Sequence, residues 1–225
     1  MSLKKIHLRK LLQFFYLPDP ARKALLRADI RDEIKKEAGR KASSGGDFHT
    51  PFWTDAKNHV AGILDLQVQT NSRVAGNKAR ARLYPQLNDG FLKWWNEKRR
   101  WRNEEFEFIP NSVIAKLPIA EVGGVIKIEN LLALRIGDQS NRIIYPYFAE
   151  VPILTEEGAR IGLWIMGEAL PSYSRDDLRI LDVLRGTSVA VRDVPFLGNE
   201  RDLLLRNYRR LNDEWEKLRE EYGGG

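Results

Sequence analysis

The chain has 225 residues and an ordinary globular composition, with 43% hydrophobic and 30% charged residues. It contains no cysteine, which excludes disulfide frameworks, thiolate metal sites and cysteine nucleophiles. No apolar run approaches the ~20 residues that a membrane-spanning helix needs, so we expect no transmembrane segment and a cytoplasmic location.

The charge is distributed unevenly, although the net charge is only +6. Residues 1–102 carry 22 Lys and Arg against 10 Asp and Glu, whereas residues 103–225 carry 15 against 21. Such an asymmetry indicates two regions with different partners. The basic half could contact phosphate groups, an anionic membrane surface, or the acidic half of the same chain.

Two helices and a linker are predicted at the N-terminus. The helix over residues 3–16 has one apolar face, formed by Leu8, Leu11, Leu12 and Phe15. A charged helix over residues 21–38 has a thin apolar stripe, formed by Ala24, Leu25, Ala28 and Ile34. Residues 39–47 are rich in glycine and serine, which predicts a flexible linker and a boundary near residue 45.

A basic helical region is predicted over residues 46–104. Thr50 and Pro51 suit the N-cap and first position of a helix that reaches about residue 71. A run of cations with no acid among them follows, formed by Arg73, Lys78, Arg80 and Arg82. Pro85 is predicted to begin another helix, which reaches about residue 103.

Strand-like runs follow residue 105, at residues 106–109, 113–119, 125–136, 142–148 and 188–194. The turn formers at residues 137–141 predict a hairpin between the third and fourth runs. Thr155 is predicted to cap a helix with two acids in its first turn. Residues 175–185 are predicted as a short helix, although their alternation also fits a strand.

The C-terminal segment is predicted as a long helix with a heptad seam. The seam residues are Leu204, Tyr208, Leu211, Trp215, Leu218 and Tyr222. The first five form a candidate interface, which either docks on its own domain or joins a protein partner or a second copy.

Three regions result: an N-terminal helical segment (1–45), a basic helical region (46–104) and an α+β domain with a C-terminal helix (105–225). We therefore predict an α+β fold, in which a helical N-terminal half precedes a mostly antiparallel sheet with flanking helices.

Few sets of residues have the spacing of a known catalytic site. The sequence lacks the motifs of P-loop, dinucleotide-binding, G-x-S-x-G hydrolase and zincin enzymes. Asp55 and His59 have the i, i+4 spacing that places them on one helix face, and His49 precedes that helix. These three residues could bind a divalent metal or act as acid and base. The alternative is an ordinary surface pair.

The most informative segment is FLKWWNEKRRWR, residues 91–102. On a helical wheel its apolar arc contains Trp94, Trp95 and Trp101, and two cations, Lys98 and Arg102, fall inside that arc. Cations among indoles suit a surface that holds phosphates and stacks bases. The alternative is that the tryptophans belong to the core and the long cationic side chains reach solvent around them.

Our leading hypothesis is a non-catalytic protein that binds DNA or RNA, or acts as an adaptor, through this basic face and without a cofactor or metal. The residues expected to contact nucleic acid are Arg73, Lys78, Arg80, Arg82, Lys93, Trp95, Lys98, Arg99, Arg100 and Arg102. The alternatives are a metal-assisted hydrolase or nuclease that uses His49, Asp55 and His59, and a structural subunit of a protein assembly.

Overall fold

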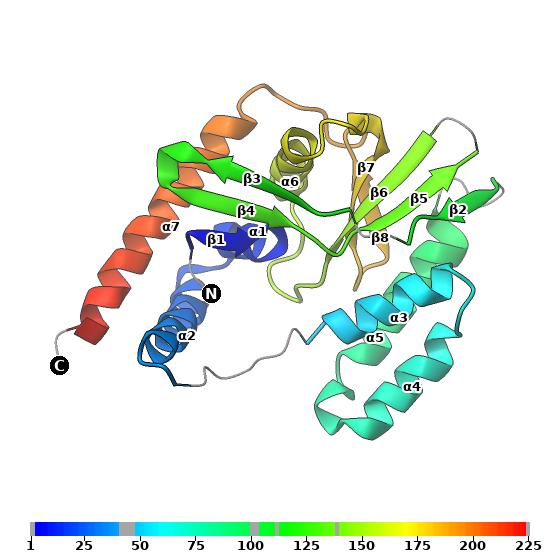
Figure 1. Ribbon diagram of the computed structural model, residues 1–225, viewed down its shortest axis with the longest axis horizontal. Helices are drawn as coiled ribbons and strands as arrows, with labels where there is room; N and C mark the ends of the chain where they lie inside the picture. Colours follow the sequence, from blue (N-terminus) through cyan, green and yellow to red (C-terminus); the bar gives the residue numbers. More distant parts are fainter. Residues whose placement is uncertain (1–2, 41–47, 100–103, 111–112, 138–139, 224–225) are drawn as a thin grey trace.

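The computed structural model describes residues 3–40, 48–99, 104–110, 113–137 and 140–223. The α+β fold that the sequence predicts is confirmed, with two mixed sheets and helices around them (Figure 1). The helices are α1 (Leu8–Tyr16), α2 (Asp19–Glu37), α3 (Thr50–Val60), α4 (Leu66–Gly76), α5 (Tyr84–Lys93), α6 (Glu156–Ala169) and α7 (Glu200–Gly223). Short helical turns are η1 (Lys78–Arg80), η2 (Trp94–Lys98), η3 (Ala120–Val122) and η4 (Arg175–Asp177). None of the described helices combines the length and the apolar content that crossing a bilayer requires.

The larger sheet contains, in spatial order, β2 (Phe106–Phe108), β5 (Leu132–Ile136), β6 (Ser140–Tyr147), β7 (Leu178–Asp182) and β8 (Thr187–Ala190). The smaller sheet contains β1 (Lys5–His7), β4 (Gly124–Ile128) and β3 (Ala115–Ile119). Four of the six described strand pairings are antiparallel, so the mostly antiparallel arrangement is confirmed. β1 with β4 and β6 with β7 are the parallel pairs, and α6 provides the crossover between β6 and β7.

The five-stranded sheet lies between two hydrophobic cores because alternate side chains of a strand point to opposite faces. On β5, Ala133 faces the core that α1, α6 and α7 share. Leu132 and Leu134 face the second core, which is formed with α3, α4 and α5. Figure 1 shows these three helices grouped beside the sheet, on the side away from α7.

The N-terminal segment is part of the larger core. Ile6 of β1 lies opposite Ile126 of β4, and Leu8 and Leu11 of α1 are buried with Tyr208 of α7. Hydrophobic packing is therefore continuous between residues before position 45 and residues after position 105.

Several segments differ from the sequence prediction. The helix expected from Thr50 to about residue 71 is two helices, α3 and α4, which are separated by residues 61–65. The helix expected at residues 175–185 is wrong, because Leu178–Asp182 form the strand β7 between β6 and β8. All five β7 residues are buried, and a strand covered on both faces loses the clear alternation that marks a strand in sequence. The run expected at residues 125–136 is two strands in different sheets, and the chain turns between them at Asn130, whose φ is 64°.

The predicted cap of α6 is confirmed, since the Thr155 hydroxyl accepts a hydrogen bond from the Gly158 backbone N–H at 3.0 Å. We expect Thr155→Ala to lower the free energy of unfolding by about 1 kcal/mol, because one N–H of the first turn loses its acceptor. Thr155→Ser keeps the hydroxyl and serves as the control. Urea unfolding followed by circular dichroism measures both, and equal losses in the two variants would contradict a capping role.

Candidate functional site

The tryptophan-rich segment is part of the second core. α5 ends at Lys93 and the chain continues through η2, a π-helical turn, so the wheel that treated residues 91–102 as one α-helix is wrong. Trp94 and Trp95 are 2% and 7% exposed and pack with Phe91 in the core beside the sheet. Both indoles therefore serve the packing of this region onto the sheet. Residues 100–103, which include the predicted contacts Arg100 and Arg102, lie outside the described residues.

The Trp95 ring is covered by its neighbours. The Arg99 guanidinium lies 3.6 Å from its centroid, and Phe106 packs edge-on with the two centroids 5.4 Å apart. Phe91 stacks parallel to it at 6.4 Å. These neighbours occupy the surface on which a nucleobase would stack.

Two of the predicted upstream cations are held by carboxylates. Arg73 donates hydrogen bonds of 2.8 and 2.9 Å to the two oxygens of Asp55. Arg82 donates from both terminal nitrogens to Glu150, which belongs to the acidic half of the chain. The charge asymmetry of the sequence is thus partly neutralised within the molecule.

The other predicted cations of this region have different surroundings. The Arg80 guanidinium lies 5.2 Å from the centroid of the Tyr84 ring. The side chains of Lys78 and Lys93 are exposed to solvent. They add positive potential to this side of the protein.

The structure does not bring the three catalytic candidates together. Asp55 is buried and paired with arginine as above, and the His49 ring stacks on Phe148 with centroids 4.7 Å apart. The Nδ1 atom of His59 lies 3.2 Å from the Leu64 carbonyl oxygen, just beyond its own helix. Within the described ranges, no group of three or more His, Asp or Glu side chains is arranged to hold a metal ion.

The heptad seam of α7 packs inside the chain. Its five candidate interface residues are all buried in the larger core: Leu204, Tyr208, Leu211, Trp215 and Leu218. Tyr208 also donates its hydroxyl proton to the Leu3 carbonyl oxygen. The seam therefore packs on its own molecule, which is one of the arrangements that the sequence left open.

A basic pocket of about 190 Å³ lies where the end of the helical region meets β6, β7 and β8. The described residues that line it are Trp94, Lys98, Arg99, Ile144, Arg179, Thr187, Ser188, Arg192 and Asp193. Four of these side chains are cationic and one, Asp193, is a carboxylate. Among the residues predicted from the sequence, Lys98 and Arg99 are the two that the structure brings to this pocket.

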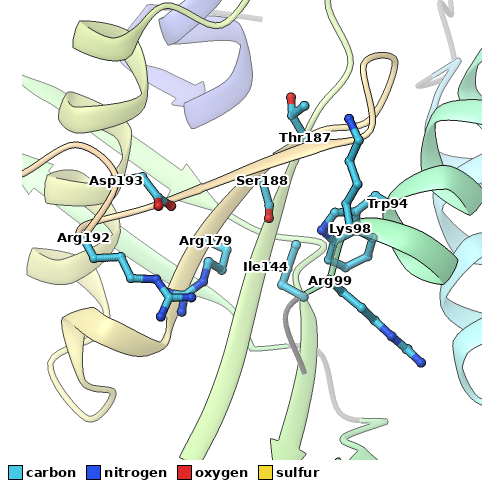
Figure 2. Close-up of a pocket in the computed structure, with 9 residues that line it drawn as sticks. All are labelled: Trp94, Lys98, Arg99, Ile144, Arg179, Thr187, Ser188, Arg192 and Asp193. Carbon is cyan, nitrogen blue, oxygen red and sulfur yellow. The ribbon is translucent and has the colours of Figure 1, made fainter. Parts of the chain in front are cut away.

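Figure 2 shows how the lining side chains are arranged. Arg179 and Arg192 reach the same end of the pocket and Lys98 lies on the opposite side, whereas the Arg99 guanidinium points away from them and lies over the Trp95 ring. Ser188 carries its hydroxyl between the arginine pair and Lys98. The pocket is thus bounded by positive charge on two sides, with a neutral hydrogen-bonding group between them.

Arg179 is held in an unfavourable position for a cation. Its side chain is anchored by hydrogen bonds from Nη1 to the carbonyl oxygens of Asp176 and Leu178. Burial, reinforced by the neighbouring cations Arg142 and Arg192, lowers the pKa of Arg179 to about 10. The group remains charged at neutral pH, and the carboxylates of Asp193 and Asp177 offset part of the effect of the neighbouring cations.

Sequence patterns did not predict the pocket residues Arg179, Arg192, Thr187 and Ser188. Their elements lie about 80 residues after Lys98, so only the packing of η2 against β8 brings them together. One signal was present in the sequence. Arg179 interrupts the apolar run Leu178–Leu181, and a cation within a fully buried strand needs a local reason to be there.

The comparisons with known proteins do not name a function for this site. No protein-family model and no curated protein sequence matches the chain.

Proposed function

We propose that this chain is a non-catalytic, cytoplasmic protein that binds nucleic acid through phosphate contacts in the basic pocket. The observation that carries the proposal is that Lys98, Arg179 and Arg192 line one cavity, in which Asp193 is the single carboxylate among the described lining residues. Phosphate contacts made by Lys and Arg supply most of the affinity of proteins for nucleic acid.

The location of the pocket supports this proposal over the helical face that the sequence suggested. Trp94 and Trp95 are core residues, and Arg73 and Arg82 are paired with carboxylates. Lys98, Arg179 and Arg192 line a cavity that a ligand can enter. The exposed Lys93 lies on the helix that leads directly into η2 and adds positive potential nearby.

The test measures binding of short single-stranded DNA and RNA by fluorescence anisotropy between about 50 and 200 mM salt. We expect affinity to fall steeply with salt for the natural chain. Arg192→Gln and Lys98→Gln should each weaken binding and reduce the logarithmic salt slope by roughly 0.7, which corresponds to one lost contact with a single strand. Both residues are exposed, so neither substitution is expected to disturb folding.

Two controls define what a negative result means. Lys217→Gln removes an exposed cation from α7, away from the pocket, and should leave the slope unchanged. The double variant Lys78→Gln, Lys93→Gln reports on the helical face. Loss of binding in this double variant, with the two pocket variants behaving like the natural chain, would overturn the proposal for the pocket.

A further inference from the structure

We propose that the basic pocket receives a terminal phosphomonoester, the phosphorylated end of a nucleic-acid strand, in preference to a phosphodiester within the strand. This inference rests on the proposed function and specifies the chemical group that the pocket selects. It follows from the charge, the size and the hydrogen-bonding groups of the cavity.

The charge of the lining fits a dianion. Lys98, Arg179 and Arg192 line the cavity together with the carboxylate of Asp193, which leaves an excess of two positive charges. Asp193 Oδ2 also accepts a hydrogen bond from the Ala190 backbone N–H at 2.9 Å. A phosphomonoester carries about −1.5 to −2 charges at neutral pH, whereas a bridging phosphodiester carries one. The monoester therefore compensates the repulsion around Arg179 more completely.

The size of the cavity fits one phosphate group. A pocket of about 190 Å³ has room for one phosphate group with a few ordered waters. A phosphate within a strand would also carry a sugar on each side, and the cavity would have to admit both. A terminal phosphate enters with one sugar behind it, which can stay outside.

The hydrogen-bonding groups fit a phosphate with three free oxygens. Arg179 and Arg192 at one end present planar guanidinium groups, which suit paired hydrogen bonds to phosphate oxygens. Ser188 offers a hydroxyl donor between the cations, and Lys98 offers an ammonium from the other side. A monoester has a third unesterified oxygen to accept from these additional donors, whereas a diester has two.

The experiment compares one oligonucleotide sequence with four ends: 5′-hydroxyl, 5′-phosphate, 3′-phosphate and 5′-methyl phosphate, with the fluorescent label always on the opposite end. The methyl phosphate is the matched ligand, because it places a phosphorus at the same position with only one negative charge. We expect one of the two phosphomonoester ends to bind at least about tenfold tighter than the hydroxyl and methyl phosphate ends, since hydrogen bonds between charged groups are the strong ones.

Variants locate the effect. Arg192→Gln and Ser188→Ala should remove most of the advantage of the phosphomonoester end, and Lys217→Gln should keep it. Circular dichroism and thermal unfolding confirm that the variants remain folded. If both pocket variants still bind the phosphomonoester end more tightly than the hydroxyl end, the phosphate binds elsewhere on the protein and the inference is overturned.

The remaining outcomes separate this inference from the proposed function. Equal binding of all four ends, weakened equally by Arg192→Gln, would overturn the preference for an end and leave nucleic-acid binding in place. Binding of none of them would overturn both. Inorganic phosphate is the last probe: if it stabilises the protein against heat with the same dissociation constant as the phosphorylated strand, the ligand is free phosphate and the strand-end assignment fails.

Discussion

Replacing Gly90 with alanine is expected to lower the free energy of unfolding by about 3 kcal/mol and to weaken ligand binding at the basic pocket. A Cβ at this position of α5 would overlap the Val183 carbonyl oxygen and lie 2.7 Å from that of Leu184. These atoms are backbone, so they cannot rotate away as a flexible side chain would. The helix or the turn after β7 must shift instead.

The same contact is made from the other side by Gly186, which has a φ of +57°. A Cβ there would overlap the Gly90 carbonyl oxygen and lie 3.4 Å from the Trp94 backbone nitrogen. Two glycines thus let the helical region approach the β7–β8 turn directly. This approach also sets the position of Lys98 relative to Ser188, so a displaced helix would spoil the pocket as well as the core.

Gly76→Ala is the matched control for this prediction. It lies at the end of α4, and a Cβ there would meet no other atom within 4 Å. We expect a change between zero and a gain of about 1 kcal/mol, because alanine is the better helix former. Urea unfolding followed by circular dichroism measures both variants. Equal midpoints for Gly90→Ala and the natural chain would show that the helix and the turn are not in such close contact.

Local signals predicted much of the fold. The turn formers at residues 137–141 predicted a hairpin, and β5 and β6 pair as its arms. The hydroxyl of Thr155 and the heptad spacing of α7 likewise marked elements that the structure contains. These features depend on residues a few positions apart. The strand β1 was missed because its pairing with β4 joins segments about 120 residues apart, and three residues carry no periodicity of their own.

α2 shows how a buried charge can conceal the packed face of a helix. Its predicted apolar stripe contains Ala24, Leu25, Ala28 and Ile34, but Leu25 is 38% exposed. The buried residues are Arg22, Leu26 and Ile30, which follow one another at intervals of four. The buried face of α2 cannot be found from its apolar residues alone, because its first residue is Arg22.

The candidate site was predicted only in part, for a related reason. Lys98 and Arg99 were singled out among many cations, but composition could not tell them from Arg73 and Arg82, which carboxylates hold. That distinction depends on which acids reach them after folding. Trp95 was predicted to contact nucleic acid, with the core as the alternative for the tryptophans, and the sheet opposite Trp94 and Trp95 supplies the apolar face that buries them. Whether an indole belongs to the core or to a ligand-binding surface depends on what the fold packs against it, which the local sequence does not show.

Glu214→Gln is expected to lower the free energy of unfolding by about 3 kcal/mol, because it leaves the buried Arg22 cation without its main partner. Arg22 is 3% exposed and donates two hydrogen bonds of 2.7 Å to the carboxylate oxygens of Glu214. Glutamine has nearly the same shape, so the loss measures charge and not packing. Asp19 also accepts a hydrogen bond from Arg22, but its own side chain is largely exposed and compensates the cation less well.

The matched control is Glu221→Gln on the same helix, whose partner Arg27 is also on α2. Both members of that pair are more than one third exposed, so we expect a loss below about 1 kcal/mol. The double variant Arg22→Met, Glu214→Leu removes both charges and should recover most of the stability that Glu214→Gln loses, since an apolar pair needs no compensation. Urea unfolding compares the four proteins. If the double variant is no more stable than Glu214→Gln, an unpaired buried charge is not the cause of the loss in Glu214→Gln.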